Sequence, residues 1–210
     1  MSKAVEAWSG DFGVEYTNRN MMPTDELDKI YKVRFGISRS EMNERFISNL
    51  DRDIKILEVG CNVGLQLTML QNMGFKNLYG IELLPYAVEA AKNQTKGINI
   101  IQGSAYDVPF KDNYFDLVFT SGLLIHIPPV NINLVINEMA RCTKRYIWAY
   151  EYYAPEYTAI NYRGHNDLLW KADFAEMFKS LKFRLVKEQR FKYLDKDNLD
   201  TMFLMEKSKC

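Results

Sequence analysis

The sequence has few cysteines, no excess of either charge and no long apolar run, and each shortage argues against a class of protein. Its three cysteines, Cys61, Cys142 and Cys210, are scattered and form no C-x-x-C pair. This pattern is typical of a reducing compartment and argues against disulfides and a zinc site, so we expect no bound metal. Lys plus Arg and Asp plus Glu both number 27, which leaves no basic excess for general nucleic-acid binding.

Segments that would direct the chain to a membrane are also missing. Residues 1–13 lack the apolar run of a signal peptide, and no stretch approaches the length needed to span a bilayer. We therefore expect a soluble, cytoplasmic protein with neither a nucleic-acid nor a membrane partner. The sequence leaves the oligomeric state open.

Nearly continuous apolar runs alternate with helical patterns between residues 55 and 152. The runs are KILEV, NLYGIEL, INIIQG, FDLVFTS and RYIWAYEY, and the helical patterns are GLQLTMLQNMG, PYAVEAAKNQ and NINLVINEMARC. Continuous apolar runs are typical of strands covered on both faces. After residue 182, FRLVKEQRF and TMFLMEK are separated by a short polar turn, which predicts an antiparallel pair. The expected fold is α/β, a doubly wound, mostly parallel seven-stranded sheet with helices on both faces.

The glycine turn ILEVGCNVG resembles a dinucleotide-binding loop but has Asn62 where the G-x-G-x-x-G spacing wants a second glycine. Gly60 and Gly64 preserve the tight turn and the close helix–strand contact, whereas the missing glycine is the one that lets the backbone approach a pyrophosphate. S-adenosylmethionine (SAM) has no pyrophosphate, and Asn tolerates a positive φ better than other non-glycine residues. The Glu58 carboxylate would repel a diphosphate and suits a ligand with an ammonium and a sulfonium. The loop therefore favours SAM over a nicotinamide or flavin dinucleotide.

Two later strand ends complete the predicted cofactor site. Glu82 ends the second strand, about twenty residues after the glycine turn, where an acidic side chain can accept both ribose hydroxyls of an adenosine. Ser104, Ala105 and Tyr106 follow the third strand and could flank the adenine. We also assign Cys61, Leu83 and Ser121 to this site. Cys61 has no base nearby in sequence, so we expect a small apolar role rather than a nucleophilic one.

The motifs LEVGCNVG, GIELLPYAVEAAK, GSAYDVPF and FDLVFTSGLLIHIP together resemble those of the class I SAM-dependent methyltransferases, over roughly residues 55–150. The flanking WSGDFGVEYTNRN, GLLIHIPP and EYYAPEYTAINYRGHNDLLWKADF resemble a narrower family, the methylases associated with pseudaminic acid biosynthesis. Those are small stand-alone enzymes encoded among bacterial surface-glycan genes. The resemblance implies methyl transfer from SAM, with S-adenosylhomocysteine (SAH) as product, to a small-molecule acceptor such as a sugar or sugar-linked intermediate.

We find no repeat and no low-complexity linker, so we expect one methyltransferase domain over residues 1–210. It would comprise an N-terminal helical or lid segment (1–50), a SAM-binding core (55–150), an acceptor-site insertion (151–180) and a C-terminal strand pair (183–207). Residues 1 to about 23 have an irregular aromatic and polar pattern, and helices are expected from Thr24 and over Ser40–Leu50. By analogy with class I methyltransferases, Tyr16 or Arg19 in the first segment could meet the methionine carboxylate of SAM; the alternative is packing on the sheet edge.

Acceptor-site candidates cluster after the fourth and fifth strands. The catalytic candidates are His126, Glu151, Tyr153 and His165, and the substrate-binding candidates are Tyr152, Tyr162 and Arg163. Arg163 could grip a carboxylate or phosphate, or be an ordinary surface arginine. His165 could contact substrate or lie on the surface, and the residues after the fifth strand could line the acceptor pocket or pack in the core.

His126 follows the fourth strand, near the expected position of the methyl group. It is either a general base or a turn histidine that bonds its own backbone before Pro128 and Pro129. A base is needed only when the acceptor must lose a proton, which a carboxylate or phosphate acceptor need not do.

Three rival functions remain. A dinucleotide-dependent oxidoreductase shares the strand–glycine–helix–acid pattern but is disfavoured by Glu58 and Asn62. A nucleic-acid methyltransferase of the amino-group type would have a [D/N/S]-P-P-[Y/F] turn after the fourth strand, where this chain has TSGLL. The third rival function is a non-catalytic binding module on the same fold. Within the leading function, an alternative is methyl transfer to a carboxylate or phosphate-type oxygen of another metabolite.

Overall fold

A seven-stranded sheet forms the centre of the computed structural model, which describes residues 3–208, in the order β3-β2-β1-β4-β5-β9-β8. Its strands are β1 (Lys55–Val59), β2 (Asn77–Glu82), β3 (Asn99–Gln102), β4 (Phe115–Ser121), β5 (Thr143–Tyr152), β8 (Phe183–Lys192) and β9 (Leu199–Lys207). The first five are parallel, whereas β9 runs antiparallel to both β5 and β8. The predicted doubly wound sheet and its C-terminal antiparallel pair are confirmed.

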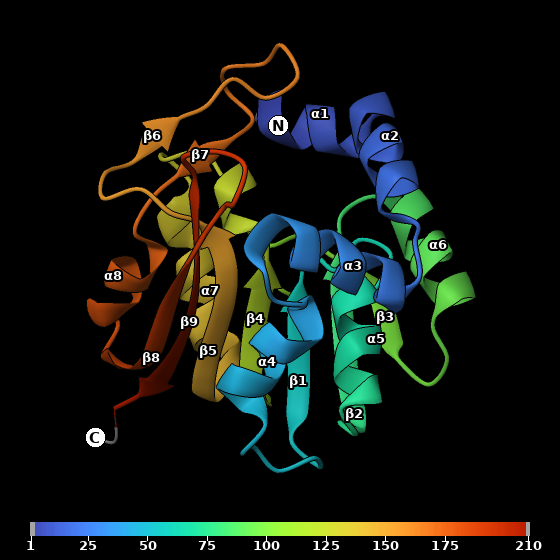
Figure 1. Ribbon diagram of the computed structural model, residues 1–210. Coiled ribbons are helices and arrows are strands. Elements are labelled where there is room, and N and C mark those ends of the chain that lie inside the picture. The colour runs from blue at the N-terminus through green and yellow to red at the C-terminus, as the bar shows by residue number, and fades with distance from the viewer. Residues whose placement is uncertain (1–2, 209–210) are drawn as a thin grey trace.

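Helices cover both faces of the sheet (Figure 1). On one face, α4 (Arg39–Ile47), α5 (Leu65–Asn72) and α6 (Pro85–Gln94) pack on a core that includes Leu117 and Trp148. On the other face, α7 (Ile132–Cys142) and α8 (Phe174–Lys179) pack on a core that includes Val118 and Ile147. Neighbouring residues of one strand thus enter opposite cores, which explains why the strands read as continuous apolar runs.

The irregular N-terminal pattern conceals two helices, α1 (Lys3–Ser9) and α2 (Asp11–Asn20), which lie across the carboxyl end of the sheet (Figure 1). Gly13 allows them to meet closely, since a Cβ there would lie 2.1 Å from the Trp8 carbonyl oxygen. α3 (Thr24–Phe35) begins where predicted, and the expected helix over Ser40–Leu50 is α4, capped by Ser38 and Glu41 in a capping box.

The insertion after β5 carries two short strands that the sequence did not indicate, β6 (Thr158–Ala159) and β7 (Trp170–Lys171). A 3₁₀ turn, η1 (Leu124–His126), follows β4. Of the helices between residues 3 and 208, none has the length and apolar character to cross a membrane.

Candidate functional site

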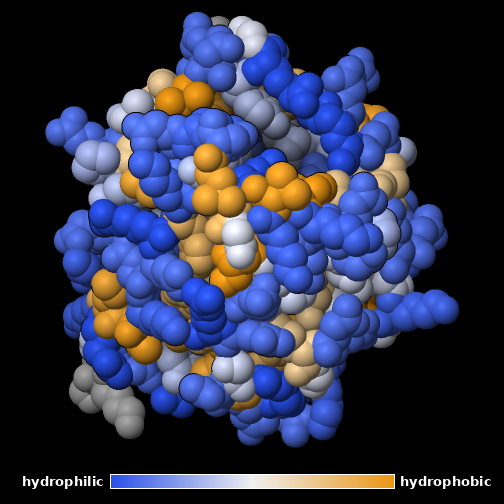
Figure 2. Space-filling view, viewed as in Figure 1, coloured by the Kyte–Doolittle hydropathy of each residue, from blue (hydrophilic) through white to orange (hydrophobic). Residues whose placement is uncertain are grey.

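A cavity of about 390 Å³ lies beyond the carboxyl ends of β1, β2, β4 and β5 and beneath α1, α2 and α3. In the space-filling view the surface is hollowed between the N-terminal helices and α3, with apolar side chains gathered at its border (Figure 2). The volume lies within the range typical of small-molecule sites, roughly 300–1,000 Å³. Carboxyl ends of parallel strands are the usual ligand position in such sheets.

The glycine turn after β1 forms the floor of this cavity. Gly60, Asn62 and Gly64 all have positive φ, of 74°, 46° and 75°, which agrees with the reason given for Asn at the middle position. The N–H groups of Gly60 and Cys61 both donate to the Ile81 carbonyl at 2.9 Å, which ties the turn to β2. Burial raises the pKa of the Cys61 thiol, so it stays protonated and unreactive.

Gly64 does not line the cavity, contrary to its assignment as a cofactor residue. A Cβ there would lie 2.9 Å from Thr95 Cγ2 and 3.9 Å from the Ala91 Cβ. Its role is the close packing of the start of α5 against the end of α6, which holds the turn in place.

The Glu82 carboxylate lines the cavity at the end of β2. Oε2 accepts a hydrogen bond from the Asn62 N–H at 2.9 Å and Oε1 accepts one from the Leu84 N–H at 3.0 Å. Burial raises its pKa, while these N–H donors oppose the shift. Each oxygen keeps a lone pair for a further donor, so the group is fixed and still able to accept a pair of ligand hydroxyls.

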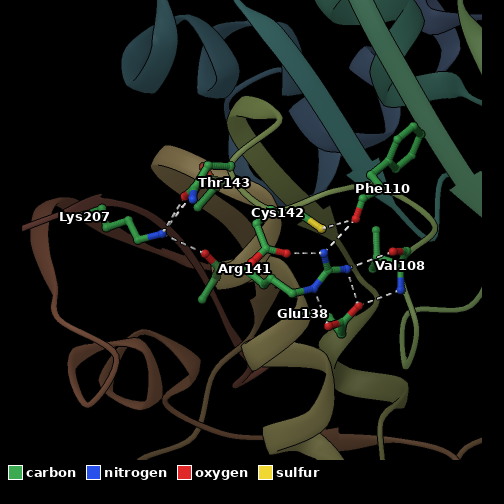
Figure 3. Close-up of polar contacts among 10 residues, drawn as sticks. Val108, Phe110, Glu138, Arg141, Cys142, Thr143 and Lys207 are labelled. Atoms are coloured by element: carbon green, nitrogen blue, oxygen red, sulfur yellow. Dashed lines mark hydrogen bonds and ion pairs between the residues drawn. The ribbon is translucent and has the colours of Figure 1, made fainter.

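The loop after β3 brings Ser104, Ala105 and Tyr106 to the same wall, beside Leu83. It is held from behind by Arg141 of α7, which donates to the Val108 carbonyl at 2.9 Å and the Phe110 carbonyl at 2.7 Å (Figure 3). Glu138 pairs with Arg141 at 2.7 Å and accepts the Val108 N–H at 2.8 Å. The sequence did not single out this clamp, because its members come from two segments about thirty residues apart.

Glu58 and Arg39 are both buried near the glycine turn. Glu58 lines the cavity, is 3% exposed, and its Oε2 has no hydrogen-bond partner within residues 3–208. Burial holds its pKa well above the usual range, and the nearby Arg39 guanidinium opposes that shift. Arg39 donates to Gln66 Oε1 at 3.1 Å and Ser121 Oγ at 3.2 Å, so it orients two further lining residues. Arg39 was not predicted; a lone arginine in an amphipathic helix looks like a surface residue until its burial is known.

His126 lies at the opposite wall, 8% exposed, with its ring 4.4 Å from the Trp8 ring and 5.6 Å from the Tyr162 ring. Nδ1 is 2.7 Å from the Leu168 carbonyl oxygen, which can only accept, so Nδ1 carries the proton. The prediction that the His126 ring bonds the backbone of its own turn, given above as the alternative to a general base, is therefore wrong. Burial lowers the pKa of His126 to about 4, which leaves Nε2 as a neutral, weakly basic acceptor.

Glu151 and Tyr153 do not reach the cavity, contrary to their assignment as catalytic candidates. Glu151 is fully buried and accepts hydrogen bonds from Thr120 Oγ1 at 2.7 Å and from the Leu123 and Ile125 N–H groups at 3.2 and 3.3 Å. Its carboxylate thus organises the turn that carries His126. Tyr153 instead packs beneath the Arg190 guanidinium, 3.8 Å from the ring centroid.

Three other candidates also lie outside the cavity lining. Arg163 and His165 are exposed at the tip of the insertion, where an isolated bridge joins Tyr162 to His165. Arg19 pairs with Glu15 along α2 at 3.7 Å. Tyr16, Tyr152 and Tyr162 line the cavity, and the cofactor-binding role of Tyr16 and the substrate-binding roles of Tyr152 and Tyr162 stay predictions.

Further residues line the acceptor end without having been predicted. They are Trp8, Tyr31, Arg34, Tyr150 and Asp200. One sequence signal for Asp200 existed: a carboxylate inside the apolar strand LDTMFLM is unusual unless the side chain has a buried partner.

The strand order, with its antiparallel strand β9 between β5 and β8, is that of the class I SAM-dependent methyltransferase fold. Residues 57–146 match a family model described as "Methyltransferase domain". Residues 57–146 are thus similar to methyltransferase domains, and this likeness supports SAM as the cofactor.

Individual proteins are similar to longer stretches of the chain. A sterol 24-C-methyltransferase of Schizosaccharomyces pombe is 25% identical over 213 residues, covering 85% of this chain and 55% of that protein. The SAM-bound structure of magnesium protoporphyrin IX methyltransferase from Synechocystis covers 99% of both chains with a TM-score of 0.71 at 12% identity. A structure described as the [4+2]-cyclase SpnF covers 81% of this chain and 80% of that one with a TM-score of 0.65 at 14% identity. This chain spans about half the length of the curated relatives it matches.

Proposed function

We propose that this protein is a SAM-dependent methyltransferase that acts on a small-molecule acceptor. The observation that carries the proposal is the pair of buried oxygens at the glycine turn, Glu58 Oε2 and Asn62 Oδ1. Both belong to residues that line the cavity, and neither has a hydrogen-bond partner in the described part of the chain. Buried acceptors without donors are costly, so they favour a ligand with a cationic, hydrogen-rich end.

The residues of this half of the cavity fit SAM in their chemistry. Glu58 and Asn62 would accept hydrogen bonds from its ammonium, Glu82 from its ribose hydroxyls, and the Ser104–Tyr106 loop would flank its adenine. When bound, SAM supplies an electrophilic methyl group on a sulfonium. The chain then has to position an acceptor in line with that methyl group and exclude water.

The acceptor half supports a small acceptor because α1 and α2 roof it with aromatic rings. Trp8 contacts the rings of Phe12 and Tyr16 edge-on, each at 5.1 Å between centroids. A roof of this kind leaves little room for a folded macromolecule and suits a molecule with apolar faces and a few polar groups.

The finer proposal is a sugar or sugar-linked intermediate of bacterial surface-glycan synthesis, of the pseudaminic acid type. It rests on the flanking motifs quoted above, together with the aromatic and polar lining. Its test is mass spectrometry of the surface glycan from cells with and without this protein. Loss of a methyl group on deletion is the expected result, and an unchanged glycan contradicts the proposal.

The broader proposal is tested by calorimetric titration with SAH and with NADH, followed by a transfer assay with radiolabelled SAM. We expect SAH to bind and NADH not to bind, and we expect label to enter a small-molecule fraction. NADH binding without SAH binding would favour the oxidoreductase instead. The transfer assay is essential because the fold also occurs in a protein described as a [4+2]-cyclase, so SAH binding alone does not establish methyl transfer.

A further inference from the structure

Asp200 is a buried carboxylate at the acceptor end of the cavity, about fifty residues beyond the motifs that resemble those of the methyltransferases. It lies on β9, directly opposite Tyr152 of β5 in the antiparallel register. The residue is 1% exposed, yet it is one of those that line the cavity. A carboxylate in this setting is rare without a specific partner.

The two oxygens of Asp200 have different surroundings. Oδ2 accepts hydrogen bonds from the Tyr150 hydroxyl at 2.6 Å and the Tyr193 hydroxyl at 3.0 Å. Oδ1 is buried and has no hydrogen-bond partner among residues 3–208. The phenols therefore fix the orientation of the carboxylate while leaving one oxygen for a donor that the described chain does not provide.

No cation of the described chain forms a short ion pair with this carboxylate. Arg34 lines the same cavity, but its guanidinium lies over the Tyr193 ring at 5.4 Å. The Lys171 ammonium donates to Asn198. The titratable and charged groups facing Asp200 are thus Tyr150 and Tyr152 from β5, Tyr193 after β8, Arg34 from α3 and Lys171 from β7.

We propose that Oδ1 of Asp200 accepts the hydrogen of the acceptor's nucleophilic group and takes its proton during methyl transfer. The inference rests on the proposed function. As the acceptor atom forms its bond to the methyl carbon, the sulfur–methyl bond breaks and its electron pair stays on sulfur. The proton on the acceptor atom passes to Oδ1, which leaves a neutral thioether, a methylated acceptor and a protonated Asp200.

This assignment defines the class of acceptor. The acceptor group brings a proton that must leave: a hydroxyl loses it as its oxygen attacks, whereas an ammonium must lose it first to become a nucleophilic amine. The acceptor atom is not a carboxylate or phosphate oxygen. An anionic acceptor group beside a buried carboxylate would be repelled, whereas a hydroxyl or ammonium satisfies the free oxygen.

Asp200 is also the stronger base of the two groups available at this end. Burial raises the pKa of Asp200 to about 6, while burial lowers the pKa of His126 to about 4. At neutral pH both are deprotonated, and the group with the pKa closer to the operating pH is the better proton acceptor.

The test uses the full-length protein, radiolabelled SAM and the small-molecule fraction of a cell extract as probe. Asp200→Asn keeps the shape and an oxygen for the two phenols but removes the base. We expect transfer to fall by on the order of 10²-fold or more, with SAH affinity changed less than about twofold. Asp197→Asn, an exposed aspartate three positions earlier, is the matched control and should leave both unchanged.

A second variant covers the case in which Asp200→Asn fails to fold. Tyr193→Phe removes one donor that lowers the pKa of Asp200, so the acidic limb of the pH–rate profile should move to higher pH. Three results would overturn this inference without affecting the proposed function. They are full transfer by Asp200→Asn, an acidic limb of the pH–rate profile that does not move in Tyr193→Phe, and a product methylated on a carboxylate or phosphate oxygen. Absence of transfer by the unmodified protein would instead overturn the proposed function, and this inference with it.

Discussion

The cofactor half and the acceptor half of the cavity are built in different ways. The cofactor half comes from the ends of consecutive strands β1, β2 and β3 and the short loops that follow them. The acceptor half gathers side chains from α1, α2, α3, the turn after β4, β5 and β9. Trp8 and Asp200, from opposite ends of the chain, line the same cavity. The first half follows from local sequence, whereas the second depends on how distant segments meet.

The largest effect is expected in the cofactor half, from Glu82→Ala. The change removes an acceptor for ribose hydroxyls and frees the Asn62 and Leu84 N–H groups that the carboxylate holds. We expect SAH affinity to fall on the order of 10²-fold or more, since each charged hydrogen bond contributes about 1.5–3 kcal/mol. Calorimetric titration measures the loss. Glu89→Ala, an exposed acid on α6, is the control, and an equal loss there would undermine the comparison.

A second prediction concerns pH and the Glu58 carboxyl. Its raised pKa means that the free protein holds a proton on this group up to an unusually high pH. An ammonium prefers the deprotonated form, so SAH affinity should rise with pH until that pKa is passed. Glu58→Gln should reduce affinity roughly tenfold and flatten the dependence. If SAH affinity still rises with pH in Glu58→Gln, the pH dependence comes from another titratable group.

His126→Ala is expected to have a moderate effect, confined to the acceptor half. The imidazole packs on Trp8 and Tyr162, so its loss should reduce kcat/KM about tenfold through poorer acceptor positioning, with SAH affinity unchanged. Steady-state kinetics against the same extract fraction measure this effect. A loss of 10²-fold or more, with the acidic limb of the pH profile abolished, would make His126 the base instead of Asp200.

The smallest effect is expected from Arg163→Ala and His165→Ala. Both side chains are exposed at the tip of the insertion and outside the cavity lining. We expect SAH affinity and turnover to change less than about twofold. A tenfold loss of turnover would mean that this loop closes on the acceptor, and the acceptor half would then extend to residues 161–166.

The contrast between the two halves explains which sequence predictions were confirmed. The mostly parallel sheet and the antiparallel C-terminal pair followed from the apolar runs and the short polar turn between the last two strands, because hydrophobic periodicity is a local property. Positive φ at Asn62 was foreseeable because residue chemistry and turn geometry are linked within a few positions. The expected roles of Gly64 and Glu151 differed from those observed because a residue near the end of a strand can contact either the ligand or the protein behind it. Only the packing of α6 and of the turn after β4 decides this.

The sequence by itself determined the α/β fold, the glycine turn with its preference for a ligand lacking a pyrophosphate, and the acid at the end of β2. Tertiary structure alone decided the burial of Arg39 and Glu58, the neutral His126 with its Nδ1 proton on the Leu168 carbonyl, and the free oxygen of Asp200. The physical reason is that these properties are set by desolvation and by partners far away in the chain. Local patterns specify backbone geometry, whereas the charge state of a side chain and its unpaired hydrogen-bonding atoms depend on what surrounds it.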